Sequence, residues 1–346
     1  RLEERPGGGI AVPEVAQQHL FRLLARARSC VWTLEQTPED PDGPPPLQKG
    51  GAVASPCILA ALGPSWTGMA RVLEAVLASA PAELAKEAAG RADSLDHSFS
   101  EAAPAVMAVK ILRSCITASG SAELIGADAP RFASMLLHLL VGVVRRGPAH
   151  HLALALLAGL VPTAPRHGLK DEFAEAFKVV CELTVQRLSA RSNAALEELT
   201  PLFELLLACA TDLEEALYGS PCLGQLEQLA LAALGAADRD LNRAVLQFLL
   251  KFATSADPRV QCLFADFVPQ LIATALQHFH KWPAATRKHS SSLFVVFLER
   301  HGPQFHSTLL VIWQQPGTSG VHTALAAEHR EVCAQLFSQL TGPRFK

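Results

Sequence analysis

Amphipathic segments recur along this chain at a nearly constant spacing. The second segment of each successive pair begins near Pro104, Pro148, Asn193, Asp238, Pro283 and Val321. The period is roughly 44 residues and shortens to about 39 at the end, in or close to the range of about 40 to 47 typical of two-helix repeats. A period of this length predicts an array of repeated helix pairs and not one closed core.

Apolar residues at helical spacing also predict the first helix of each pair. These helices are expected at 66–80, 128–146, 170–189, 222–234, 258–280 and 303–315. In the fourth pair one apolar stripe consists of Leu223, Leu226, Leu229, Ala230 and Ala233. The facing stripe consists of Val245, Leu246, Leu249, Leu250 and Phe252. Gly235 is expected to end the first helix, and Asp238 and Asp240 lie where carboxylates stabilise the start of the next.

Composition agrees with a chain made of helices. Apolar residue types make up 49% of the sequence and aromatic types only 6%. Strands favour aromatic and β-branched residues, whereas the Leu and Ala that dominate here favour helices. We therefore predict an all-α fold, an α-solenoid superhelix of HEAT repeats in which antiparallel helix pairs stack side by side.

The expected domain organisation is one array with local interruptions. Residues 1–12 are predicted to be a disordered start and 13–346 a single HEAT-repeat array. Residues 37–54 are rich in Pro, Gly and acidic residues and are predicted to be a disordered loop. Residues 81–103 interrupt the period and are predicted to form an interhelical insert. Because the first residue is Arg1 and not Met, we expect a piece of a longer protein.

Charge and hydropathy argue against two classes of partner. The 30 basic and 33 acidic residues give a formal charge of −3, which provides no field for a phosphate backbone, so no direct nucleic-acid partner is expected. The longest apolar runs, Phe132–Val144 and Leu152–Val161, are shorter than the roughly 20 residues of a spanning helix, so no membrane insertion is expected. Eight scattered cysteines suit a reducing compartment.

The sequence contains none of the common motifs that mark a catalytic or metal site. There is no glycine-rich phosphate loop, nucleophile elbow, HExxH or CxxC motif. His278, His280 and His289, and the neighbours His150 and His151, lack partners at metal-ligand spacing. We therefore predict no enzyme activity, no metal site, no catalytic residue and no cofactor.

Several segments together resemble one family. Residues 238–249 read DRDLNRAVLQFL, residues 289–313 read HSSSLFVVFLERHGPQFHSTLLVIW, and the chain ends in LAAEHREVCAQLFSQLTGPRFK. In this order they resemble the C-terminal HEAT-repeat portion of an importin-β-type nuclear transport receptor (karyopherin), in the branch of importin-thirteen and transportin-SR. The segment PCILAALGPSWTGMARVLEAVL resembles the helix that opens this portion. The resemblance covers most of the chain but about a third of a full-length receptor.

The resemblance implies a set of partners. It implies protein cargo bound on the concave face, the GTPase Ran bound mainly through N-terminal repeats that precede this part, and nucleoporins. It also implies shuttling between nucleus and cytoplasm. The sequence thus predicts a segment of a receptor for Ran-dependent nucleocytoplasmic transport. The alternative is a HEAT-repeat scaffold subunit of another complex, because one stack serves unrelated assemblies.

Two residue pairs are candidates for specific roles. In transportin-SR members a helix at the position of 105–118 carries several arginines that bind phosphorylated Arg-Ser-rich cargo. Lys110 and Arg113 occupy matching positions, share a helix face and are candidate cargo-binding residues, although exposed cations are often only solvated. The smaller number of cations favours the importin-thirteen-like side. Asp240 and Arg243 are candidates for the hydrogen-bond ladder that joins adjacent repeats, with cargo contact as the alternative.

Acidic residues cluster around the third pair of segments. The cluster consists of Glu197, Glu198, Glu204, Asp212, Glu214 and Glu215. Such a patch attracts a basic cargo segment by electrostatic steering. It is equally typical of the solvated side of an amphipathic helix.

Overall fold

The described part of the protein is almost entirely helical. The computed structural model describes residues 129–146, 150–190 and 196–278 without interruption. Shorter described stretches are 3–4, 10–11, 73, 108–109, 112–113, 115–116, 119, 282–283, 286–290, 292–297, 299–300, 307 and 311. Within these residues the strands are β1 (Glu3–Glu4) and β2 (Ile10–Ala11), which pair antiparallel. Apart from these two short strands the described elements are helices, which confirms the predicted all-α class for this part of the chain.

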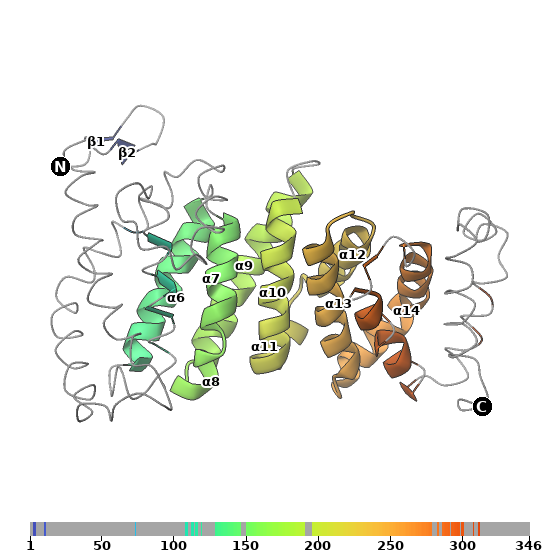
Figure 1. Cartoon of the computed structure of the whole chain (residues 1–346). Coiled ribbons are helices and arrows are strands. Elements are labelled where there is room, and N and C mark those ends of the chain that lie inside the picture. The colour runs from blue at the N-terminus through green and yellow to red at the C-terminus, as the bar shows by residue number, and fades with distance from the viewer. Residues whose placement is uncertain are drawn as a thin grey trace, which may run out of the picture. The chain divides into compact units, whose positions relative to one another are not determined.

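Nine labelled helices follow one another from residue 129 to residue 278 of the described part. They are α6 (Ala129–Arg146), α7 (His150–Leu160), α8 (Thr163–His167), α9 (Lys170–Ala190), α10 (Leu196–Asp212), α11 (Glu214–Tyr218), α12 (Leu223–Leu234), α13 (Arg239–Thr254) and α14 (Pro258–His278). Figure 1 shows them in order from green to orange. We call the helical residues between 108 and 119 the 108–119 segment, and those between 286 and 300 the 286–300 segment.

The observed helices agree closely with the predicted ones. The first helices of four predicted pairs, at 128–146, 170–189, 222–234 and 258–280, correspond to α6, α9, α12 and α14. The predicted second helices near Pro148, Asn193 and Asp238 correspond to α7, α10 and α13. The short helices α8 and α11 were not predicted. The loop 37–54, the insert 81–103 and Lys110 lie outside the described residues, as do most of 1–12 and 303–315.

The fourth pair illustrates why these residues form helices. The Asp238 carboxylate accepts hydrogen bonds from the backbone N–H groups of Asp240 and Leu241, at 2.9 and 3.0 Å. These donors have no partner inside the helix, so the cap stabilises the start of α13. Of the ten residues in the two predicted stripes, all are buried except Leu229 and Leu250, which are half-buried. The apolar pattern therefore located the interior of this pair.

The chain divides into two compact units, Arg1–Thr184 and Val185–Lys346. In the first unit α6 packs against α7 and α8. A Cβ atom placed on Gly159 of α7 would lie 3.6 Å from a methyl carbon of Ile116, so α7 lies beside the 108–119 segment. The buried His150 of α7 places its Nε2 atom 2.8 Å from the Thr184 hydroxyl of α9. Helix α7 is thus held on both sides.

In the second unit the helices form two layers. Helix α10 packs against α13, and α12 packs against both α13 and α14. Second helices of successive pairs therefore contact each other, and so do first helices of successive pairs (Figure 1). The α10–α13 contact contains a row of aromatic rings, with centroids of Phe203 and Phe248 5.8 Å apart and of Phe248 and Phe252 5.6 Å apart. This packing leaves one long side of α10 and of α13 open to solvent.

Candidate functional site

The open side of α10 and α13 is the candidate binding surface, and we call it the second-helix face. It consists of the exposed and half-exposed residues Thr200, Glu204, Leu207, Ala208 and Thr211 on α10, and Arg243, Gln247, Leu250, Lys251 and Thr254 on α13. The five residues on α10 and the five on α13 follow each other at the same intervals along their helices. The intervals agree because the two helices bury their remaining residues in the same pattern. The second-helix face thus presents equivalent positions of α10 and α13 side by side.

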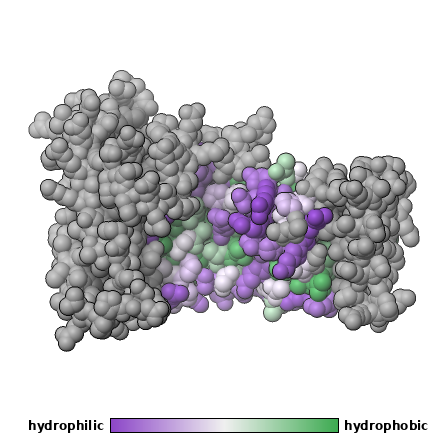
Figure 2. All heavy atoms as spheres, viewed as in Figure 1, coloured by the Kyte–Doolittle hydropathy of each residue, from purple (hydrophilic) through white to green (hydrophobic). Residues whose placement is uncertain are grey.

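The chemistry of this face is mixed. It combines one carboxylate, two cations, short hydroxyl side chains and two half-exposed leucines. Hydrophilic and hydrophobic residues are interspersed on the described part of the surface seen in Figure 2. Among the described residues, the large apolar side chain that is exposed is Val311, outside this face. The second-helix face therefore resembles the composition of a non-obligate protein interface more than an apolar groove.

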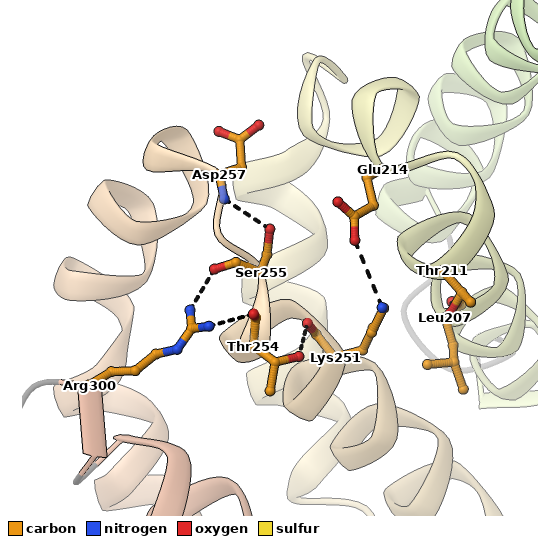
Figure 3. A network of polar contacts seen from close by, with 8 residues as sticks. All are labelled: Leu207, Thr211, Glu214, Lys251, Thr254, Ser255, Asp257 and Arg300. Atoms are coloured by element: carbon orange, nitrogen blue, oxygen red, sulfur yellow. Dashed lines mark hydrogen bonds and ion pairs between the residues drawn. The ribbon is translucent and has the colours of Figure 1, made fainter.

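Polar contacts gather at one end of the face, around the end of α13 (Figure 3). The Lys251 ammonium lies 3.8 Å from a carboxylate oxygen of Glu214, on α11. Arg300 of the 286–300 segment donates hydrogen bonds to the backbone carbonyls of Thr254 and Ser255. The end of α13 is thus joined to the elements on either side of it.

The turn that follows α13 is fixed by local hydrogen bonds. The Asp257 backbone N–H donates to the Ser255 hydroxyl at 3.2 Å. The Asp257 carboxylate accepts from the Arg259 backbone N–H at 2.8 Å and from its guanidinium at 2.6 Å. Hydrogen bonding from the Arg259 side chain holds the pKa of Asp257 below its ordinary value.

The structure describes one residue of the predicted cargo-binding pair. Arg113 lies in the 108–119 segment and is half-buried, whereas Lys110 lies outside the described residues. The role of the pair remains a prediction.

The structure shows Asp240 and Arg243 paired with each other. The Arg243 Nη2 atom lies 3.5 Å from the Asp240 Oδ1 atom, within α13, and the side chains are 49% and 68% exposed. This contact does not join two helices, so the ladder role of these residues also remains a prediction. Contacts between neighbouring helix pairs are instead made by Lys251 and Arg300, which sequence reasoning missed.

The acidic cluster of the sequence is divided by the fold. Glu198 is buried, and its Oε1 atom lies 2.8 Å from the Arg187 Nε atom of α9. Glu204, Glu214 and Glu215 are exposed, and Glu214 pairs with Lys251. The cluster is therefore partly an internal ion pair and partly the rim of the second-helix face. Position 198 falls on the buried stripe of α10. Helical periodicity could therefore have distinguished Glu198 from the other acidic residues of the cluster.

The buried thiols belong to the interior. The side chains of Cys115, Cys181, Cys209 and Cys222 are buried. Burial raises the pKa of Cys209 strongly, and the nearby Asp212 adds to this effect. A thiol that resists ionisation is a poor nucleophile.

Metal-binding clusters and membrane-spanning helices are both absent from the described residues. Within them no three His, Cys, Asp or Glu side chains form a group able to hold a metal ion. No helix in the described part is long and apolar enough to cross a membrane.

Comparison with known proteins gives no assignment. The chain matches no family model, and no curated protein matches its sequence. The functional interpretation accordingly depends on the geometry of the helices and on the segments quoted above.

Proposed function

We propose that this chain is a HEAT-type array that binds protein cargo, as the C-terminal part of an importin-β-type nuclear transport receptor. One observation carries the proposal: α10 packs on α13 while α12 packs on α14. Contacts between equivalent helices of successive pairs are what stacking of repeated pairs requires. An array of this kind binds along its length and performs no covalent chemistry.

The second-helix face is the proposed cargo surface. Its residues alternate between polar groups and small or half-exposed apolar groups, such as Gln247 and Leu250 on α13. A partner therefore gains hydrogen bonds along with modest apolar burial, which suits an interface that must form and dissociate. The rigid aromatic row beneath it, from Phe203 to Phe252, keeps the two stripes in register.

The family resemblance supports the transport role in particular. Its most specific segment, DRDLNRAVLQFL, forms the N-cap and about the first two thirds of α13 and contributes to the second-helix face. On this proposal the partners are protein cargo, Ran bound mainly through preceding repeats, and nucleoporins, and the protein shuttles between nucleus and cytoplasm. No nucleic acid, cofactor or metal takes part.

The transport role is tested by binding of the full-length protein to Ran. Pull-down with GTP-loaded and GDP-loaded Ran is expected to retain the protein on the GTP form. Cargo captured from nuclear extract is expected to be released by excess GTP-loaded Ran if the receptor imports. Equal or absent binding to both Ran forms would contradict the transport role and leave the array as a scaffold subunit of another assembly.

A further inference from the structure

Each of the two units contains a hydrogen bond between neighbouring helix pairs that is accepted by a backbone carbonyl of a second helix or of the residue after it. In the first unit, the His167 Nε2 atom of α8 lies 2.7 Å from the Ser119 carbonyl oxygen of the 108–119 segment. In the second unit, Arg300 donates to the carbonyls of Thr254 and Ser255 (Figure 3). In both cases a side chain that belongs to one second helix, or follows it, contacts a backbone carbonyl of the preceding second helix or of the residue after it.

The acceptors of the Arg300 contact explain why that position favours a cationic donor. The final carbonyls of a helix have no partner inside it, and they form the negative end of the helix dipole. Thr254 is the last residue of α13, and Ser255 follows it. An arginine with two planar N–H groups satisfies both carbonyls at once, and its charge is favourable there. The donor of one helix pair therefore completes the helix end of its neighbour.

Each contact spans about one helix pair in sequence. His167 lies 48 residues after Ser119, and Arg300 lies 45 residues after Ser255. A contact that recurs at the period of the helix pairs belongs to the stacking of pairs and not to one local turn. The ion pair of Lys251 with Glu214 lies at the same end of α13, on the side of the preceding pair.

We infer that the Arg300 contact acts as a clasp at one edge of the second-helix face, and that breaking it lets α13 and the 286–300 segment separate at that edge. The reason is the contrast between the two sides of α13. On its α10 side the helix is held by the buried aromatic row, whereas the Arg300 hydrogen bonds are only part-buried or exposed. The exposed bonds open more easily than the apolar contact. The inference requires stacked helix pairs but not a role in transport.

The chain contains a matched control for this clasp. Arg243 is an exposed arginine on α13, and its ion pair with Asp240 stays inside one helix. Arg243→Ala therefore removes the same side chain without removing a cross-pair contact. Arg300→Lys keeps the charge but has no planar pair of donors for the two carbonyls.

Distances between spin labels on α13 and on the 286–300 segment test the clasp. Gln247 and Glu299 are replaced by a non-canonical amino acid that carries the label, since the native cysteines would compete for thiol reagents. Pulsed electron resonance then measures the distance distribution in wild type, Arg300→Ala, Arg300→Lys and Arg243→Ala, each checked by circular dichroism. We expect Arg300→Ala to raise the population of longer distances about three- to tenfold, the effect of losing charge-assisted hydrogen bonds that are partly solvated.

The outcomes separate the clasp from general loosening. Arg300→Lys is expected to widen the distribution less than Arg300→Ala, and Arg243→Ala is expected to leave it unchanged. If Arg300→Ala lowers helicity, the inference is judged from the distance distribution of Arg300→Lys compared with that of the wild type. A distribution that both Arg300 variants leave unchanged, or that Arg243→Ala widens equally, overturns the inference. Because Ran is absent from this experiment, its failure is distinct from failure of the transport role.

Discussion

Asp238 shows how one residue sets the start of an element. It precedes α13, has an extended backbone conformation and accepts two backbone N–H groups of the first turn. We predict that Asp238→Ala lowers the free energy of unfolding by about 1 kcal/mol, the usual effect of losing an N-cap. Urea unfolding followed by circular dichroism measures it. Asp240→Ala, in the same turn but without this role, is the control, and an equal loss in both variants would contradict the cap assignment.

Glu198 and Arg187 form an ion pair that is largely shielded from water, with side chains 9% and 19% exposed. Glu198→Gln leaves the Arg187 charge facing a neutral amide. Loss of one partner of a fully buried pair costs about 3 to 5 kcal/mol, so we expect about 2 to 3 kcal/mol for this slightly exposed pair. Chemical unfolding tests it. Asp240→Asn disrupts an exposed pair, and we expect it to cost less than about 0.5 kcal/mol; similar values for the two variants would refute the distinction.

Cys209 gives a prediction for alkaline pH. Its pKa is raised in the folded protein, chiefly by burial, so the folded state keeps the proton when the unfolded state has lost it. Stability from this group is therefore complete below the unfolded pKa of about 8.5 and falls as pH rises above it, with a limiting slope of about 1.4 kcal/mol per pH unit. Unfolding measured from pH 7 to 10 should show a shallower loss in Cys209→Ala than in wild type. If the free energy of unfolding falls equally with pH in wild type and in Cys209→Ala, the contribution of Cys209 is ruled out.

The sequence predicted single residues well where the controlling interaction is local. The cap of Asp238 and the stripe of Val245, Leu246 and Leu249 involve neighbours along one helix. Contacts of Glu198 and Arg300 depend on which other helix lies opposite them, and a single sequence does not contain that information. The ladder role of Asp240 and Arg243 therefore stays a prediction, and the structure adds cross-pair contacts of Lys251 and Arg300 that were not predicted.

At the scale of elements, long amphipathic helices were predicted and short ones were missed. Helices α8 and α11 each have five residues, too few to show a helical period. Gly168 after α8 has a φ of 69°, the left-handed conformation that commonly ends a helix, and offers the one local signal. Pro201 and Pro269 lie inside α10 and α14, so proline alone would have placed false boundaries there.

The aromatic row between α10 and α13 gives an element-scale prediction. Phe248 is 1% exposed and contacts the rings of both Phe203 and Phe252. Phe248→Ala is expected to lower the free energy of unfolding by about 3 to 5 kcal/mol, because it leaves a cavity where the two helices meet. Thermal and urea unfolding measure the loss. Val311→Ala, at a side chain that is 57% exposed, is expected to have little effect, and a small loss for Phe248→Ala would mean that this contact is not a main support of the unit.

At the scale of the molecule, the period of the sequence predicted the order of helix pairs and much of their interior. It did not predict which outward residues gather into a surface, since that follows from the packing of α10 on α13 and of α12 on α14. Matching stripes on the two second helices emerge only once that packing is known. We therefore propose that partners bind the second-helix face and not the exposed side of the first helices.

Photo-crosslinking from matched glutamines tests this assignment most directly. Gln247 lies on the second-helix face of α13, and Gln228 is exposed on α12, a first helix. Each is replaced by a photoreactive amino acid in the full-length protein, which is irradiated in nuclear extract with and without excess GTP-loaded Ran. The account predicts protein adducts at position 247 that change with GTP-loaded Ran and few at position 228. Adducts concentrated at position 228, or adducts at position 247 that are insensitive to Ran, would contradict it.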